Sequence, residues 1–418
     1  RRPPISTLFP YTTLFRSSFI EYLAVLVMVI YAGGASVFVR SFSPDKPMAI
    51  LLPIMMGALL FLKSGIVFNR NFYVLLLGYV LYYFAIAFKY KTIHPIFFTN
   101  MLINFLVVYL FVKTLKDKLF IIYEDLILIL SIAGLIMWLL QIILGGDNLY
   151  NLIGSIPSID TFSNVSSNGF NIIFYSIQPF SQIMVQNSLT YRNCGFAWEP
   201  GGFAVFLVLA IFIHLFFIRS EVKFNLRFWI LVIALLSTQS TTGYVIFILM
   251  MIFYLFQKNI RIVLFLFPAL ILGIVLMASL PFMRDKILLY FEEARNVDII
   301  VEQSVGNPRS RNPQRFASFV IAFRDFKNNP VFGYGGETEE RWYNKINSNI
   351  SPISGIGNLL AQYGLVGFIF FIALLIKSSR FYSSHFNYNG SYFFLLVMLL
   401  ITIDRKSTRL NSSHRIRS

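Results

Sequence analysis

The chain has 418 residues, of which 57% are hydrophobic, 17% are aromatic and only 13% are charged. A soluble domain is usually about one quarter charged, so this composition excludes an ordinary water-soluble enzyme and indicates lipid-facing helices. A single Cys and four scattered His exclude an intramolecular disulfide and offer no metal-ligand spacing. We therefore expect no metal site built from Cys or His, and no cofactor.

The formal charge of +16 could suggest a nucleic-acid partner, but part of it resides at two ends that do not look like protein. Residues 7–17 and 404–414 resemble unbroken translations of two common short-read sequencing adapters. We therefore expect residues 1–17 and 404–418 to be adapter-derived artefacts, and the genuine chain to run from about Ser18 to Ile403, cut short at both ends. The first end carries three Arg and the second a net +4, which leaves +9, and we predict no nucleic-acid partner.

A helix that crosses a membrane needs about 20 mostly apolar residues. Eleven segments are candidates, near 18–39, 48–67, 72–88, 95–112, 119–144, 199–218, 226–238, 242–257, 260–281, 357–376 and 390–403. The last segment stops after about 14 residues, which fits truncation by the adapter. The sequence therefore predicts an all-α, polytopic integral membrane protein (residues 18–403) with about 11 spanning helices, of which the last is truncated.

Lys and Arg in short loops indicate the cytoplasmic side of a membrane. They gather after the second, fourth, sixth, eighth and tenth predicted spans, with Lys89 and Lys91 as the main exceptions. Two long loops, about 145–198 and 282–356, then face outward. The second holds ten Lys or Arg against nine Asp or Glu, a balance that favours placed ionic contacts over a general polyanion-binding surface.

The first candidate cluster runs from Arg192 to Phe203, at the start of the sixth predicted span. Pro200 suits a first helical turn, and Glu199 suits a helix N-terminus, where the macrodipole favours negative charge. A capped helix alone would explain both residues. As a site, Arg192 would hold a phosphate and Glu199 would orient or deprotonate an acceptor hydroxyl, because ionisable residues at membrane depth are functional candidates.

The second cluster is Arg309 to Arg315 in the second outer loop, where Pro313 can open a helix over 313–327. Arg324 follows Arg315 by nine residues, which at 3.6 residues per turn places the two on opposite faces. We expect Arg315 to face the cavity, and Arg324 to serve structure or contact a headgroup. Arg311 and Arg324 are further candidates for substrate binding, since a guanidinium can bind two oxygens of a pyrophosphate while remaining charged.

The third cluster, Asn329 to Gly336, combines Pro330 with three Gly. A turn alone would explain this composition. As a site, exposed backbone N–H groups at Gly333 and Gly335 would cradle a phosphate or a sugar oxygen.

Five segments, in this order, carry a family resemblance: Arg192 with Gly195–Pro200; Ser240–Gly243; Arg315 with Pro330 and Gly333–Gly335; Arg324 with ten residues before Gly335; and Asn358–Gly367. They resemble motifs of the O-antigen polymerase and ligase superfamily (Wzy and WaaL proteins), over nearly half of the genuine chain. Ligase-like members usually place a His before the last segment, where this chain has Pro352-Ile353-Ser354-Gly355. This departure favours a polymerase.

The resemblance implies an inverting glycosyltransferase at the outer face of a bacterial plasma membrane. Its substrate would be a glycan on undecaprenyl pyrophosphate, with membrane lipids around it and a chain-length regulator as a candidate partner. Arg192, Glu199 and Arg315 would then be catalytic residues. Two other classes stay open: a lipid-carrier flippase or transporter, which predicts charge deep in several helices and short loops, and a structural scaffold, which gives no reason for Arg and Glu at helix mouths.

Overall fold

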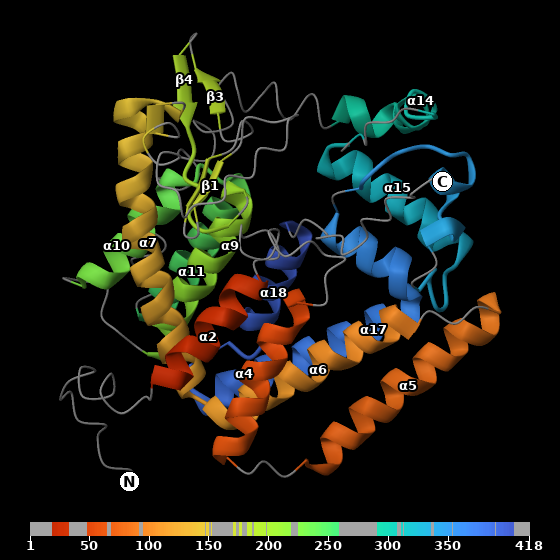
Figure 1. Ribbon diagram of the computed structural model, residues 1–418, viewed down its shortest axis with the longest axis horizontal. Coiled ribbons are helices and arrows are strands. Elements are labelled where there is room, and N and C mark those ends of the chain that lie inside the picture. The colour runs from red at the N-terminus through yellow and green to blue at the C-terminus, as the bar shows by residue number, and fades with distance from the viewer. Residues whose placement is uncertain are drawn as a thin grey trace.

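Figure 1 shows the computed structural model of the chain. It describes residues 19–32, 48–64, 68–91, 95–146, 148–149, 152, 170–172, 175–177, 182–185, 188–197, 199–218, 225–258, 291–306, 311, 313–335, 338–352, 354–388 and 390–404. The apolar helices are α2 (Phe19–Ala32), α4 (Met48–Ser64), α5 (Arg70–Tyr90), α6 (Pro95–Leu115), α7 (Lys118–Leu144), α9 (Pro200–Phe212), α10 (Leu226–Ser237), α11 (Thr241–Lys258), α17 (Gly355–His385) and α18 (Phe393–Asp404).

Ten of the eleven predicted spans coincide with helices, and the ninth, 260–281, lies outside the described residues. Within the described residues, four helical stretches are long and apolar enough to cross a membrane: Arg70–Tyr90, Lys118–Leu144, Pro200–Phe217 and Gly355–His385. The chain is thus a multi-pass α-helical membrane protein, while the number of about 11 spans remains a prediction. The adapter-like ends lie outside the described residues except for Asp404, which ends α18.

The centre of the helical bundle is α9, where eight of the 13 residues are buried. It packs against α7, α10 and α11, and it continues into a π-helical turn, η2 (Ile213–Phe217). Such a helix is apolar on every side because neighbouring helices surround it. The N-terminus of α9 carries the candidate residue Glu199, followed by Pro200.

A buried ionic cluster joins α7, η2 and α10 at their predicted cytoplasmic ends. Glu124 Oε1 lies 3.1 Å from His214 Nδ1, and Glu124 Oε2 lies 2.7 Å from Arg227 Nη2. Arg227 also pairs with Asp125, which accepts a hydrogen bond of 2.9 Å from the Tyr22 hydroxyl. Buried carboxylates are tolerated only when such partners satisfy them, so these contacts fix the packing of three helices.

The first long loop contains two short antiparallel hairpins, β1 (Phe170–Ile172) with β2 (Tyr175–Ile177), and β3 (Gln182–Val185) with β4 (Ser188–Tyr191). The predominantly helical class is as predicted, but these hairpins were not predicted, because strands of three or four residues leave little alternation in the sequence. The hairpins are held to the end of α7: Trp138 Nε1 donates to the Tyr191 carbonyl oxygen at 2.8 Å, and the Tyr175 hydroxyl donates to Gln141.

The second long loop forms a helical layer that consists of α14 (Val297–Glu302), α15 (Arg315–Asn328), the 3₁₀ turn η3 (Thr338–Glu340) and α16 (Trp342–Lys345). The predicted helix over 313–327 is confirmed by α15. Buried Val301, Ile321 and Tyr343 belong to the small core of this layer. Figure 1 shows α14, α15 and the β3–β4 hairpin at the same end of the molecule, as two loops on one side of a membrane require.

The layer is joined to α17 at a break in that helix. Gly364 has φ +64°, and the turn 330–335 docks into the gap: Tyr334 N donates to the Ala361 carbonyl oxygen at 2.9 Å, and Leu365 N donates to that of Pro330 at 2.7 Å. A Cβ at Gly364 would lie 2.4 Å from the Val331 carbonyl oxygen. Only glycine fits this position, because both the φ angle and the space exclude a side chain.

Candidate functional site

Residues 238–242 comprise the turn between α10 and α11 and the first two residues of α11, and they overlap the Ser-Thr-Gly segment of the sequence. We call them the 238–242 turn. Gln239 adopts φ +49°, and Ser240 Oγ accepts from Gly243 N at 3.3 Å, which caps the start of α11. A Cβ at Gly243 would lie 3.0 Å from Ala204 Cβ in α9. Glycine therefore lets α11 approach α9 closely, so the turn is held beside the N-terminal half of α9.

Arg192 is fastened to this 238–242 turn. Its Nε donates to the Thr238 carbonyl oxygen at 3.1 Å and its Nη2 to the Gln239 carbonyl oxygen at 2.9 Å. The next residue makes a parallel contact, because Asn193 Nδ2 donates to Ser237 Oγ at 2.9 Å. Carbonyl oxygens orient a guanidinium without cancelling its charge, so Arg192 brings a positive charge to the mouth of α9 and α11.

Glu199 stands at the N-cap position of α9, with Pro200 as the first helical residue. The backbone before it is set by Gly195, which has φ +51° and whose Cβ would lie 2.7 Å from the Phe203 ring. The helix start is therefore as predicted, yet the Glu199 side chain makes no capping hydrogen bond to α9. The macrodipole of α9 still favours a negative charge at this position.

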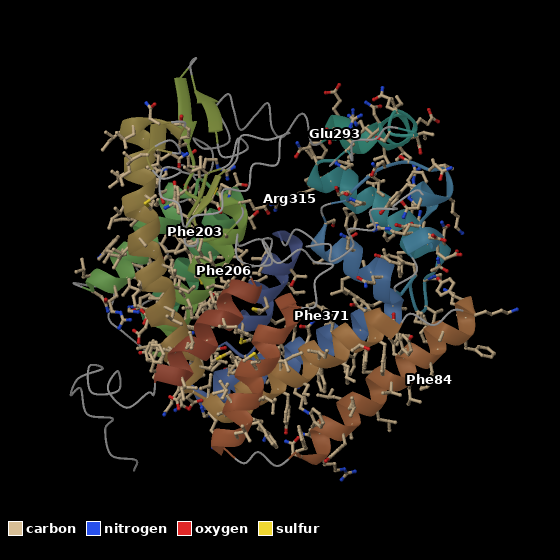
Figure 2. All side chains as sticks on the ribbon, viewed as in Figure 1. Phe84, Phe203, Phe206, Glu293, Arg315 and Phe371 are labelled. Carbon is tan, nitrogen blue, oxygen red and sulfur yellow. The ribbon has the colours of Figure 1, made fainter. Side chains whose placement is uncertain are left out.

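Arg315 reaches the same turn from the opposite direction. It is the first residue of α15, and its Nη1 lies 3.5 Å from Thr242 Oγ1, at the outer limit of a hydrogen bond. The start of α15 is held in place, because Gln314 N donates to Glu293 Oε2 at 2.7 Å. Figure 2 shows Arg315 on the side of α15 that faces α9. Two arginines that are far apart in sequence therefore converge on the 238–242 turn.

Arg324 lies on the other face of α15, as the helical spacing predicted. It forms a bidentate ion pair with Asp298, with Nη2–Oδ2 at 2.9 Å, and its guanidinium lies 5.0 Å from the centre of the Trp342 ring. The hydrogen bond from Arg324 lowers the pKa of the Asp298 carboxyl. Arg324 therefore connects α15 to α14 and α16 and is directed away from Arg315.

The Arg311 side chain likewise contacts residues of the helical layer that the second long loop forms. Its Nη1 donates to Gln303 Oε1 at 3.0 Å, and its backbone pairs with residues 349–351. The structure thus separates Arg311 and Arg324 from the pair Arg192 and Arg315.

The backbone N–H groups of Gly333 and Gly335 form hydrogen bonds that hold the docked turn 330–335. Their N–H groups donate to the carbonyl oxygens of Asn329 at 3.0 Å and Gln362 at 2.8 Å. Both have positive φ, and a Cβ at Gly333 would lie 2.3 Å from the Gln362 carbonyl oxygen. These amides serve the break in α17, so they have no N–H left for the predicted cradle of a phosphate or sugar.

Arg341 and Asp325 are important residues that the sequence analysis did not single out, and Arg341 contacts Asn358, the first residue of the last family segment. Arg341 is buried between the rings of Tyr334 and Tyr343, and its Nε donates to Asp325 Oδ2 at 2.8 Å. Its Nη2 contacts Asn358 Oδ1 in α17 at 3.3 Å. Burial raises the pKa of the Asp325 carboxyl, and the charge of Arg341 opposes this rise. These contacts lock α15, which carries Arg315, onto α17. Asp325 and Arg341 lie 16 residues apart and belong to none of the family segments, so no sequence signal identified their ion pair.

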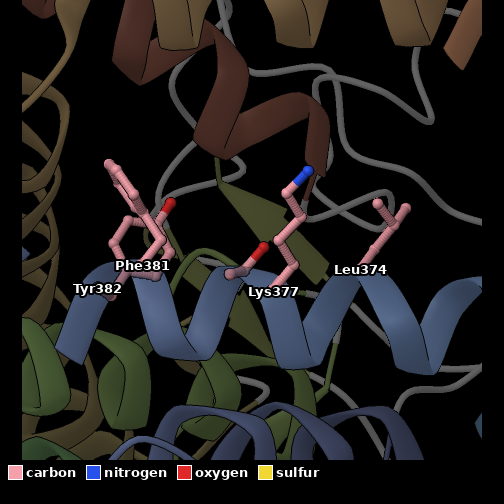
Figure 3. A pocket seen from close by; sticks show the side chains of 5 residues that line it. Leu374, Lys377, Phe381 and Tyr382 are labelled. Atoms are coloured by element: carbon pink, nitrogen blue, oxygen red, sulfur yellow. The ribbon is translucent and has the colours of Figure 1, made fainter. Parts of the chain in front are cut away.

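Two other features bear on the site. Among the described residues, no group of three or more His, Cys, Asp or Glu is placed to hold a metal ion. A groove of about 230 Å³ is lined by Leu374, Lys377, Ser378, Phe381 and Tyr382 (Figure 3). These residues follow the start of α17 by roughly 20 positions, about 30 Å along a helix, so this groove is separate from the Arg192–Arg315 site.

Comparison with known families gives one match. Residues 226–372 match a family model described as O-antigen ligase. The segment covers about a third of the chain, from α10 into α17, and it includes Arg315 and the 238–242 turn but not Arg192 or Glu199. Among curated proteins and solved structures, none matches the chain. The match supports the O-antigen polymerase and ligase superfamily and, with it, a membrane-bound enzyme that processes glycans.

Proposed function

We propose that this chain is an inverting membrane glycosyltransferase that polymerises the repeat units of an O-antigen, capsule or exopolysaccharide. Its donor would be a glycan on undecaprenyl pyrophosphate, and it would act at the outer face of a bacterial plasma membrane. The observation that carries this proposal is the convergence of Arg192 and Arg315 on the 238–242 turn, beside the mouth of the helix that Glu199 opens.

Two arginines at one place suit a leaving group that gains negative charge. In the reaction, an acceptor hydroxyl oxygen bonds to the anomeric carbon while the bond from that carbon to the diphosphate oxygen breaks. The diphosphate leaves with the electron pair, and the configuration inverts. Arg192 and Arg315 would stabilise the developing charge. Glu199 would accept the hydroxyl proton, because a carboxylate at hydrogen-bond reach of the acceptor can act as a general base.

A polymerase is favoured over a ligase by the segment before α17. Where ligase-like members usually have a His, this chain has Pro352-Ile353-Ser354-Gly355. Within it, Ser354 Oγ accepts from Gly357 N at 3.2 Å and caps α17. The neighbouring Pro352 carbonyl oxygen accepts from Asn358 Nδ2 at 3.3 Å. This segment therefore serves helix capping. The ligase is the alternative within the same class.

A flippase or transporter is the alternative from another class, and the buried Glu124–His214–Arg227 cluster is the feature that favours it. That cluster lies at the helix ends opposite the outer layer, and internal partners satisfy its charges. The outer arginines are more simply explained by chemistry at the membrane surface. A chain-length regulator would be a further protein partner of a polymerase.

The test uses the purified protein in detergent, supplied with a lipid-pyrophosphate-linked repeat unit, with and without a lipid A–core acceptor. A ladder of products without that acceptor is the expected result and would support the polymerase. A single transfer that requires the acceptor would identify a ligase. No transfer from a donor that a known polymerase consumes would refute the proposal and favour transport.

A further inference from the structure

The exposed face of α15 is unusual for a helix in an outer loop. Phe316, Phe319 and Phe323 are 51%, 38% and 36% exposed, whereas the residues on the opposite side, such as Ala317 and Ile321, are fully buried. The Phe319 and Phe323 rings stack at 5.9 Å, and Phe316 stacks on Phe291 at 5.6 Å. We call Phe316, Phe319 and Phe323 the phenylalanine stripe. Contiguous exposed apolar surface of this kind marks a binding site.

The stripe begins beside a positive charge. Residues four apart share a face of a helix, so Arg315, Phe319 and Phe323 follow one another along α15. The Arg315 guanidinium lies at the 238–242 turn, at one end of the apolar face. The surface therefore matches a ligand that has an anionic head and an apolar tail.

The chemistry of the stripe selects hydrocarbon over sugar. Aromatic rings that must also satisfy polar ligands are usually Tyr or Trp, which carry a hydrogen-bonding group. All three rings here are Phe and have none. The stripe also adjoins the start of an apolar helix, α17. A Cβ added at Gly357, in the first turn of α17, would lie 3.2 Å from Phe319 Cδ2. A chain that leaves the bilayer beside α17 meets the stripe directly.

We propose that the phenylalanine stripe binds the first isoprene units of the lipid diphosphate whose head Arg315 holds. This inference rests on the proposed function and adds the location of the lipid tail. From Phe316 to Phe323 the stripe spans about 10 Å of helix. It is therefore long enough for the part of the chain next to the diphosphate and too short for a whole polyprenyl chain.

The kinetic test compares donors that carry the same glycan diphosphate on C5, C15 and C55 isoprenoid chains. For the unaltered protein we expect KM to fall about tenfold or more from C5 to C15 and little from C15 to C55, with kcat almost constant. Phe319→Ser/Phe323→Ser should remove most of the C5-to-C15 gain. Phe84→Ser is the matched control, since Phe84 is 62% exposed on α5 and lies far from α15 (Figure 2).

An unchanged C5-to-C15 ratio in the double variant would overturn the inference and leave the glycosyltransferase proposal standing. No transfer by the unaltered protein with any donor would instead count against the proposed function. A loss of discrimination between acceptor sugars, with the lipid dependence retained, would assign the stripe to sugar and also overturn the inference.

A binding measurement covers the case in which the double variant does not fold. The unaltered protein is irradiated with farnesyl diphosphate that carries a diazirine in its first isoprene unit, and the labelled peptides are identified. Labelling at residues 316–323 that excess inorganic pyrophosphate reduces is expected. Labelling elsewhere, or equal labelling at 316–323 by a phosphatidylcholine with a diazirine in its acyl chain, would overturn the inference, the latter in favour of simple bilayer contact.

Discussion

Lys89 and Gly333 are 244 residues apart in sequence, yet Lys89 Nζ donates to the Gly333 carbonyl oxygen at 3.2 Å. Lys89 also donates to Asn329 Oδ1 at 2.7 Å, from the last turn of α5. This contact gives Lys89 a structural role on the side that we predict to face outward, where Lys and Arg are otherwise sparse in the short loops. Its charge is used to hold the turn that docks into α17.

Lys89→Met should therefore destabilise the outer layer. Loss of a charged donor to two acceptors should lower the free energy of unfolding by about 1–2 kcal/mol. The measurement is the thermal midpoint of the detergent-solubilised protein, determined by size-exclusion chromatography. Lys91→Met is the control, because Lys91 is exposed and caps α5 through its backbone. Equal shifts for both variants would contradict the role of the Lys89 contact.

Arg315 and Arg324, on one helix, should respond differently to removal. Arg315→Ala should lower kcat/KM for transfer by about 100-fold or more while the thermal midpoint stays unchanged, since a charge aimed at the leaving group is lost. Arg324→Ala should change transfer little and cost less than about 1 kcal/mol of stability, because its pair with Asp298 is partly exposed. Full activity of Arg315→Ala at normal protein level would remove Arg315 from the site.

The Asp298–Arg324 pair should also give a pH signature. Arg324 lowers the pKa of Asp298 in the folded protein, so the pair stabilises the fold above the ordinary Asp pKa of about 4 and loses that contribution as the pH falls through the lowered value. The thermal midpoints of the unaltered protein and Asp298→Asn should differ at pH 7 and converge below about pH 4. A difference that is independent of pH would show that the charge of Asp298 is not what matters.

Gly364 and Gly306 offer a matched pair for the break in α17. Both have φ near +65°, but a Cβ at Gly364 would lie 2.4 Å from the Val331 carbonyl oxygen, whereas a Cβ at Gly306 has nothing within 4 Å. Gly306→Ala should cost about 1–2 kcal/mol through backbone strain alone. Gly364→Ala should cost more than about 3 kcal/mol or abolish expression, because the docked turn must also move. Expression and thermal midpoint measured by fluorescence-detected chromatography would decide, and similar costs would argue against the docking.

Asp325 and Arg341 should be energetically coupled. Removing one partner of a buried ion pair leaves an uncompensated charge, so Asp325→Asn and Arg341→Gln should each cost about 3–5 kcal/mol. In a double-mutant cycle, the two changes together should cost clearly less than their sum. Because this pair holds α15 against α17, the single variants should also weaken donor binding through Arg315. Additive costs would show that the two residues act separately.

Hydropathy and helical periodicity predicted most of the helices and the opposite faces of Arg315 and Arg324. Both properties depend only on neighbouring residues, which is why they could be obtained from the sequence. The hairpins at 170–191 were not predicted, because they are too short to show alternation. The docking of Gly333 and Gly335 into α17 and the burial of Arg341 were not predicted either, since they depend on contacts between distant segments. Gly333 and Gly335 lie in a turn, as their sequence suggests, but their N–H groups bind carbonyl oxygens of the protein itself.

The buried cluster of Glu124, Asp125, His214 and Arg227 constrains how the protein enters the bilayer. α7 carries two carboxylates, and the guanidinium that pairs with both of them is made about 100 residues later, in α10. Until Arg227 is synthesised, α7 should stay near the translocon, the headgroups or a chaperone, because lipid offers its carboxylates no partner. Release of α7, α9 and α10 into the membrane should therefore be a single concerted event, timed by the synthesis of one arginine.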